Sequence, residues 1–229
     1  MEDFILIIIM KTNAYFDLYT EIYNSDKKSS EVKDFLNKKF PNSFNFDFES
    51  LSNKEPFSVY DKISCRSKLV EIYSWAVTDQ KAIEQIVKTT KDMGIIEIGA
   101  GRGYWASILA DCGINIAAYD IGKNENAYFY YPVNLIGNYY PIDNAERKIA
   151  SLHQDKALFL CWPPYDTPMA YNCVSEYSGN TLIYIGEDKY GCTADDKFFD
   201  FISDNFKLDN IIDMAQWEGI HDNLYIYKR

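Results

Sequence analysis

Three closely spaced glycines follow a short apolar run near the middle of the chain. The run Ile95 to Ile98 leads into Gly99, Gly101 and Gly103, and apolar residues at helical spacing come next. Glycine lets a ligand approach the backbone because no side chain intervenes. Glu97, two residues before the first glycine, could meet an ammonium group or a water held by such a ligand. The segment predicts a strand, a ligand-binding loop and a helix in succession.

The spacing of these glycines separates two classes of nucleotide-binding loop. A dinucleotide fold requires G-x-G-x-x-G, and Tyr104 stands where the last glycine belongs. The segment instead resembles the E-x-G-x-G-x-G signature of class I S-adenosylmethionine-dependent methyltransferases. This resemblance covers about residues 73–229 and implies a Rossmann-like fold with S-adenosyl-L-methionine as cofactor. Residues 1–70 resemble no family that we recognise.

The resemblance assigns further residues to the cofactor. In the family, an acid at the end of the second strand binds both ribose hydroxyls, and Asp120 stands at the matching place. Asp143 is the candidate polar group near adenine. Tyr73 lies where family members hold the methionine part, although a large aromatic side chain there is more often part of the core. The implied cofactor-binding residues are Tyr73, Glu97, Gly99, Ala100, Gly101, Gly103, Tyr104, Trp105, Asp120, Asp143 and Cys161.

A second motif follows the apolar run Ala157 to Cys161. Its two prolines fix φ and remove two N–H donors, which predicts a stiff loop at the carboxyl end of a strand, where ligands of open α/β sheets bind. The loop resembles the D/N/S-P-P-Y/F loop of amino-methyltransferases. There the polar residue and the first proline carbonyl accept hydrogen bonds from the target NH₂, and the aromatic ring stacks on it. The implied catalytic residues are Trp162, Pro163, Pro164, Tyr165 and Asp166.

The loop departs from this pattern at its first position. Trp162 stands where Asp, Asn or Ser is expected, and an indole N–H can only donate. Asp166 could supply the missing carboxylate, or Trp162 could extend the stacking surface; a Pro-Pro turn without chemistry is the alternative. His221, in the segment Gly219 to Asp222, could take a proton near pH 7 or be purely structural.

Composition limits the partners. With 229 residues, 47% of them hydrophobic, the chain fits one large domain or a domain with a cover, and its net charge of −11 argues against general nucleic-acid binding. Residues 1–70 carry 10 basic and 11 acidic side chains, so only this part offers phosphates a nearly neutral face. Its basic candidates are Lys27, Lys28, Lys38, Lys39, Arg66 and Lys68.

Cysteine and histidine usage bears on metals and on the compartment. The five cysteines form no C-x-x-C pair and the two histidines are far apart, so we expect no metal site. The odd cysteine count favours a reducing compartment, which indicates a cytoplasmic protein. The apolar run Phe4 to Met10 is too short to span a bilayer and lacks the basic start of a signal peptide.

The pattern changes near residue 70. Earlier segments predict a short helix from Glu31 to Phe40 and an extended segment in which Phe44, Phe46 and Phe48 alternate with polar residues. We interpret residues 1–70 as a small N-terminal cover, or as a lid over a substrate pocket. Residues 71–229 form the expected S-adenosylmethionine-binding methyltransferase domain.

Apolar runs alternate with helical patterns after residue 70. This predicts an α/β fold with a mostly parallel sheet, helices on both faces and an antiparallel C-terminal hairpin between Phe206 and Tyr227. We expect Thr78 and Thr193 to cap the two helices that follow them. The expected strands are Ile95 to Ile98, Ile114 to Tyr119, Ala157 to Cys161 and Thr181 to Ile185.

Two functions from different classes follow. The first is methyl transfer to a planar or amino nitrogen of a nucleobase, a protein side chain or a small molecule. A nucleobase acceptor is possible, although the negative charge argues against it. The second is a degenerate cofactor-binding regulatory or interaction module, which Trp162 keeps open. Tyr104 disfavours a third, nicotinamide-dependent, function.

Overall fold

A computed structural model describes residues 13–23, 28–40, 58–120, 137–145 and 148–229. Within them one seven-stranded sheet has the order β3-β2-β1-β4-β5-β7-β6. The extended segment expected at Phe44 to Phe48 lies outside the described residues. The strands are β1 (Ile95–Ile98), β2 (Ile116–Asp120), β3 (Asp143–Asn144), β4 (Ala157–Cys161), β5 (Thr181–Gly186), β6 (Lys207–Asp213) and β7 (Asn223–Lys228).

The first five strands are parallel, and β7 runs antiparallel between β5 and β6. The order β3-β2-β1-β4-β5 is that of a doubly wound sheet, so the carboxyl ends of β1, β2 and β4 meet at one edge. The predicted Rossmann-like sheet, mostly parallel with an antiparallel C-terminal hairpin, is therefore confirmed.

The central strands are buried on both faces, which explains why they are apolar runs rather than alternating ones. Ile95 and Phe159 belong to one hydrophobic cluster, whereas their neighbours Ile96 and Leu158 belong to the other. Successive side chains of a strand point to opposite faces, so the two clusters are the two faces of the sheet.

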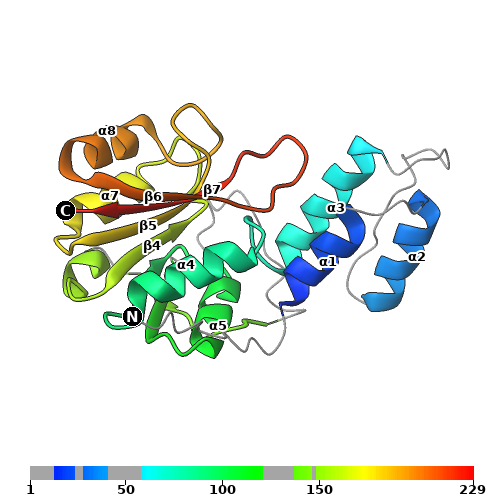
Figure 1. Ribbon diagram of the computed structural model, residues 1–229, viewed down its shortest axis with the longest axis horizontal. Helices are drawn as coiled ribbons and strands as arrows, with labels where there is room; N and C mark the ends of the chain where they lie inside the picture. The colour runs from blue at the N-terminus through cyan, green and yellow to red at the C-terminus, as the bar shows by residue number, and fades with distance from the viewer. Residues whose placement is uncertain (1–12, 24–27, 41–57, 121–136, 146–147) are drawn as a thin grey trace, which may run out of the picture.

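Helices cover both faces, as the sequence predicts (Figure 1). Side chains of α4 (Gln80–Thr90) and α5 (Tyr104–Asp111) pack in the cluster that contains Ile95. Side chains of α7 (Met169–Glu176) and α8 (Asp196–Asn205), with the short η1 (Ile149–Leu152), pack in the other.

Both predicted helix caps are wrong by one or two residues. Asp79, not Thr78, caps α4, because its side chain accepts hydrogen bonds from the backbone N–H groups of Lys81 and Ala82. The Thr78 hydroxyl instead donates to Asn13 Oδ1 at 2.6 Å. Asp195 caps α8, whereas the hydroxyl of Thr193 is hydrogen bonded to the Tyr184 hydroxyl and to the backbone N–H of Glu187.

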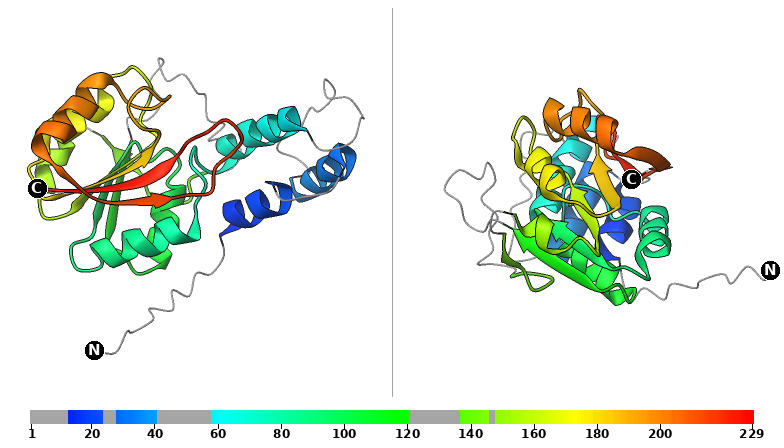
Figure 2. Two further views of the ribbon diagram at one scale, coloured as in Figure 1. Left: turned by 45° about the horizontal axis from the view of Figure 1, so that its top comes forward. Right: turned by 90° about the vertical axis from the view of Figure 1, so that its left-hand side faces the viewer.

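The N-terminal helices α1 (Ala14–Tyr23), α2 (Ser29–Lys39) and α3 (Val59–Ile72) lie beyond one end of the sheet (Figure 2). α1 and α3 run side by side next to the connection between β6 and β7. Tyr15 of α1 accepts a 3.1 Å hydrogen bond from Trp217 Nε1 of that connection and stacks on Tyr73. α3 continues past residue 70, and the division into two domains stays a prediction.

Candidate active site

The glycine loop closes onto the end of β2. The backbone N–H groups of Gly99 and Ala100 donate to the carbonyl of Tyr119 at 2.9 and 3.0 Å. The N–H of Gly101 donates to Asp120 Oδ2 at 2.7 Å. The structure therefore brings the loop and the strand-end acid together, as the sequence predicts.

The three glycines have φ angles of +81°, +58° and +73°, which side chains disfavour. A Cβ at Gly99 would lie 2.8 Å from Met169 Cε, and one at Gly103 would lie 2.8 Å from Tyr140 Cβ. At Gly101, no atom of the described residues beyond the two chain neighbours lies within 4 Å of a Cβ position. The loop therefore needs glycine for packing at its two ends, while the described residues leave the space around its middle glycine open.

Glu97 is a buried carboxyl beside this loop. Its side chain is 1% exposed, and burial, with a smaller contribution from nearby Asp120, raises its pKa to about 8. The Oε2 atom has no hydrogen-bond partner among the described residues. A buried polar atom without a partner is costly, so this oxygen is suited to a cationic or donor group of a ligand.

The remaining cofactor candidates occupy different surroundings. Tyr73 and Tyr104 pack against each other with ring centroids 4.9 Å apart, and Trp105 is buried against Phe159. These three rings are part of the hydrophobic core, in agreement with the packing interpretation of Tyr73. Cys161 ends β4, and burial, with a smaller effect of Glu97, raises the pKa of its thiol. Asp143 is exposed on β3 beside Tyr119.

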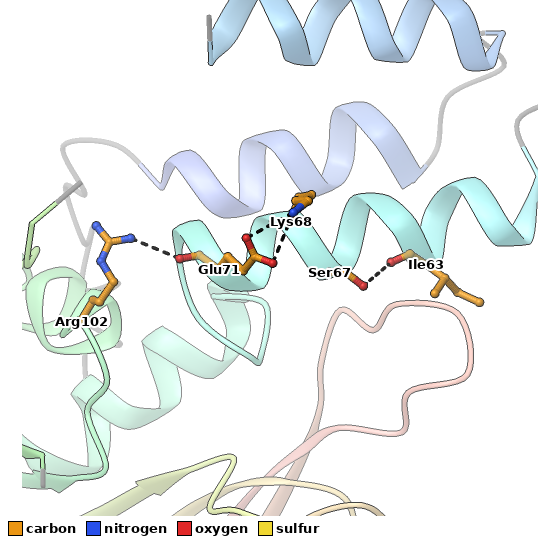
Figure 3. Close-up of polar contacts among 5 residues, drawn as sticks. All are labelled: Ile63, Ser67, Lys68, Glu71 and Arg102. Carbon is orange, nitrogen blue, oxygen red and sulfur yellow. Dashed lines mark hydrogen bonds and ion pairs between the residues drawn. The ribbon is translucent and has the colours of Figure 1, made fainter. Parts of the chain in front are cut away.

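Arg102, between the second and third glycines, holds the loop against α3. Its Nη1 donates to the carbonyl of Ile72 at 2.6 Å. The same atom donates to the carbonyl of Glu71 at 3.3 Å (Figure 3). Its Nε donates to the carbonyl of Gly137 at 2.8 Å. The last carbonyls of a helix have no partner within the helix and favour a cation. No pattern in the sequence indicates this role.

Trp162 directs its indole toward another acid. Its Nε1 donates a 2.7 Å hydrogen bond to Oδ1 of Asp222, at the end of the β6–β7 connection. Asp222 is 2% exposed, and its pKa is raised to about 7 mainly by burial, against the lowering effects of Trp162 and Arg66. No local pattern in the sequence indicates this role of Asp222, because its partner is 60 residues away.

The rest of the Pro-Pro-Tyr loop pairs with the segment after β5. The carbonyl of Pro163 accepts from the N–H of Ala194 at 3.0 Å, and the N–H of Asp166 donates to the carbonyl of Ala194 at 2.9 Å. Pro164 forms an isolated bridge with Thr193. Both Tyr165, at 65%, and Asp166 are exposed. The buried acid at Trp162 is thus Asp222 and not Asp166.

Glu187 fixes the connection that carries Asp222. Its Oε1 accepts from the backbone N–H of His221 at 3.0 Å, and its Oε2 accepts from that of Cys192 at 2.6 Å. The His221 side chain itself is exposed. Glu187 therefore links the end of β5 to the turn that holds Asp222.

Metal and membrane features are not seen in the described part of the chain. No group of three or more His, Cys, Asp and Glu side chains there could hold a metal ion. No helix in the same ranges is both long and apolar enough to cross a membrane. All five cysteines are free thiols.

No family model matches the chain, and no curated protein matches it. Several solved structures are similar to it. Magnesium protoporphyrin IX methyltransferase from Synechocystis PCC 6803 with bound S-adenosylmethionine is 12% identical over 90% of this chain and 98% of that chain, with a TM-score of 0.45. A protein of the NADB-Rossmann superfamily from Streptococcus agalactiae is 12% identical over 67% and 71%, with a TM-score of 0.44.

A third similar structure is the tRNA (uracil-54, C5)-methyltransferase of Pyrococcus abyssi in complex with S-adenosyl-L-homocysteine. It is 14% identical over 64% of this chain and only 37% of that chain, with a TM-score of 0.42. Identities and TM-scores this low carry no argument about function, whereas the strand order and the geometry of the site do.

Proposed function

We propose that the chain is an S-adenosylmethionine-dependent methyltransferase that acts on a planar or amino nitrogen. The observation that carries this proposal is that, among the described residues, Glu97 Oε2 has no hydrogen-bond partner and the glycine loop beside it is open at Gly101. Both lie with Asp120 at the carboxyl ends of β1 and β2, where doubly wound sheets bind nucleotides.

These residues fit the cofactor. The Glu97 carboxylate would accept from the ammonium group of its methionine part, and Asp120 would accept from the ribose hydroxyls. Because no atom in the described part of the chain, apart from the two neighbouring residues, lies within 4 Å of a Cβ position at Gly101, the cofactor can approach the backbone there. When bound, S-adenosylmethionine would supply a methyl group on a sulfonium. An acceptor nitrogen in line with the carbon–sulfur bond would take the methyl group, and the electron pair of that bond would go to sulfur.

The Pro-Pro-Tyr loop would hold the acceptor. A planar amino nitrogen is a poor nucleophile because its lone pair is delocalised, and oxygen acceptors on its hydrogens favour a tetrahedral nitrogen. Trp162 cannot provide such an oxygen, but it holds the Asp222 carboxylate at its indole N–H. We assign to Asp222 the acceptor role that Asp, Asn or Ser has in the related loops. Asp222 also takes the proton that the nitrogen releases, and the exposed Tyr165 ring stacks on the acceptor.

The net charge of the chain favours some classes of methyl acceptor over others. The similar structures include enzymes described as acting on a porphyrin and on a tRNA. A nucleobase would have to be flipped or single-stranded to reach the loop, and a net charge of −11 opposes a long phosphate chain. A small molecule or a protein side chain is a methyl acceptor that the negative net charge does not oppose in this way.

One observation favours the second candidate function, a cofactor-binding module without catalysis. The carbonyl of Pro163, which would accept from the target amine, already accepts from the N–H of Ala194. A carbonyl oxygen has two lone pairs, so this bond does not prevent a second one.

Calorimetric titration tests the cofactor assignment, with S-adenosylmethionine, S-adenosylhomocysteine and NAD as ligands. We expect micromolar binding of the first two and none of NAD. Transfer of a labelled methyl group into small-molecule, protein and RNA fractions then tests catalysis. Binding without transfer into any fraction favours the module, and no binding contradicts both functions.

A further inference from the structure

Arg66 of α3 lies against the tryptophan of the Pro-Pro-Tyr loop. Its guanidinium carbon is 5.1 Å from the ring centroid of Trp162 and 5.4 Å from that of Trp75. The two indoles stack on one another, with centroids 5.1 Å apart and planes 13° apart. The N-terminal helices therefore supply a cation to the edge of the sheet where the acceptor would bind.

The hydrogen-bonding capacity of Arg66 is largely unused. Its Nε and Nη2 atoms are buried, and neither has a hydrogen-bond partner among the described residues. Contact with aromatic rings uses the face of a guanidinium, whereas its N–H donors point outward in the plane. The two indoles therefore stabilise the charge without satisfying the donors, and buried donors without acceptors destabilise a fold.

The neighbouring carboxylates among the described residues do not accept hydrogen bonds from Nε or Nη2 of Arg66. Asp222 and Glu187 both raise the pKa of Arg66 electrostatically, although burial lowers it more. Asp222 Oδ1 accepts from the indole of Trp162. The two carboxylate oxygens of Glu187 accept from the backbone N–H groups of His221 and Cys192. No ion pair joins Arg66 to either acid within the described residues.

We propose that Arg66 binds a carboxylate of a ligand, most directly a carboxylate on the methyl acceptor, which would also have a planar part against Trp162. This inference rests on the proposed function. The guanidinium fork matches a carboxylate in a bidentate manner. Because Asp222 and Glu187 lie within electrostatic range of Arg66, a singly charged carboxylate is favoured over a doubly charged phosphate. The methionine carboxylate of the cofactor is a second source of the same chemistry.

Two titrations distinguish these sources. The first uses benzoate, a planar carboxylate, and follows the intrinsic fluorescence that Trp75 and Trp162 contribute. The second compares S-adenosylhomocysteine with methylthioadenosine, which lacks the amino-acid carboxylate. Both use the full chain with three variants: Arg66→Met, Arg66→Lys and, as a control on the same helix, Lys68→Met. Lys68 pairs with Glu71 at 3.5 Å and is part of neither the loop nor the glycine site.

For an acceptor carboxylate, we expect benzoate affinity to fall at least tenfold in Arg66→Met, partly in Arg66→Lys and not in Lys68→Met, with S-adenosylhomocysteine affinity unchanged. A tenfold loss for S-adenosylhomocysteine with methylthioadenosine unaffected would assign the carboxylate to the cofactor. Equal affinities of wild type and Arg66→Met for benzoate and for S-adenosylhomocysteine would overturn the proposal.

The two proposals fail separately. A wild-type chain that binds benzoate through Arg66 but not S-adenosylhomocysteine contradicts the proposed function and leaves the carboxylate site standing. Inorganic phosphate, titrated in the same way, should bind more weakly than benzoate, and tighter binding would contradict the choice of a carboxylate. Thermal melting of each variant shows whether a lost response reflects a lost fold.

Discussion

The indole Nε1 of Trp162 and Oδ1 of Asp222 are 2.7 Å apart, and this hydrogen bond joins the loop after β4 to the connection between β6 and β7. In the related amino-methyltransferase loops, an oxygen-bearing side chain occupies the position of Trp162. Here the tryptophan donates to a carboxylate and thereby holds an acceptor oxygen at the same end of the loop. In the proposed function, Asp222 therefore supplies the oxygen that the first residue of the loop would otherwise supply.

The first prediction concerns Asp222→Asn. An asparagine oxygen can still accept from the Trp162 indole, but the side chain can no longer take a proton. We expect kcat to fall by 10²-fold or more, in the range of a lost general base, with cofactor affinity unchanged. Single-turnover methyl transfer and calorimetry measure the two effects. An unchanged kcat would remove Asp222 from the mechanism.

The second prediction is a pH dependence. Burial raises the pKa of Asp222 to about 7, and the ionised form is the one that accepts. We expect kcat to rise with pH through about 7 and then to level off. Trp162→Phe removes the hydrogen bond that lowers this pKa, so the midpoint should move to higher pH. A midpoint that does not move in Trp162→Phe would contradict the assignment to Asp222.

The third prediction concerns Glu97→Gln. The pKa of Glu97 is raised from 4.5 to about 8, so between these pH values the folded state binds more protons than the unfolded state. The free energy of unfolding contributed by this group is fully present below pH 4.5 and is lost as pH rises through about 8. Glu97→Gln should therefore become more stable relative to wild type as pH rises from 5 to 8, measured by urea denaturation at each pH.

The same variant tests the ammonium site. Binding of a cation at Glu97 requires the carboxylate, so cofactor affinity in the wild type should increase as pH rises toward 8. In Glu97→Gln the affinity should be 10- to 100-fold weaker at pH 8, about 1.5–3 kcal/mol, the usual contribution of a hydrogen bond to a charged group. Its pH dependence should be lost. If Glu97→Gln gained stability but kept its affinity for the cofactor, Glu97 would be a buried acid with no role in binding.

The strands could be predicted from the sequence because their signal is local. A strand buried on both faces needs a short apolar run; β4 and β5 each have one, and in β1 Glu97 alone interrupts it. The glycine loop could also be predicted, because its three glycines are closely spaced, and the family resemblance implied Asp120 as its neighbour.

The helix caps and the acceptor side depend on partners far away in the chain. The neighbouring Asp79 accepts from the first N–H groups of α4, while the Thr78 hydroxyl donates to Asn13, 65 residues earlier. α3 brings Arg66 to Trp162, and the β6–β7 connection brings Asp222 to it. No neighbouring motif indicates this position for either residue, so Asp166 was only one candidate for the missing carboxylate, beside a purely stacking role of Trp162.

The fourth prediction concerns the exposed aromatic ring of the loop. Tyr165 is 65% exposed, so Tyr165→Ala should change the free energy of unfolding by no more than about 0.5 kcal/mol. If the ring stacks on the acceptor, the variant should lose about 10-fold or more in kcat/KM. Tyr190, which is 89% exposed on the loop after β5, provides a matched Tyr190→Ala control that should keep full activity. Equal activity of the two variants would remove Tyr165 from the acceptor site.

The fifth prediction compares two glycines with the same local properties. Gly101 has a φ of +58° and Gly113 a φ of +86°, and at neither position does an atom of the described residues beyond the chain neighbours lie within 4 Å of a Cβ. Alanine at either should therefore cost about 1–2 kcal/mol of stability from the left-handed backbone alone. Gly101 lies in the loop bonded to Asp120, whereas Gly113 follows the far end of α5.

Only Gly101→Ala should weaken cofactor binding, because only there would the new methyl group occupy the space that the ligand approaches. We expect at least a tenfold loss of S-adenosylhomocysteine affinity in Gly101→Ala and none in Gly113→Ala, with similar melting temperatures for both. Gly101→Val, with a larger side chain in the same open space, should abolish binding. Equal losses of affinity in the two alanine variants would attribute the effect to stability, and the glycine loop would then lose its assignment as the cofactor site.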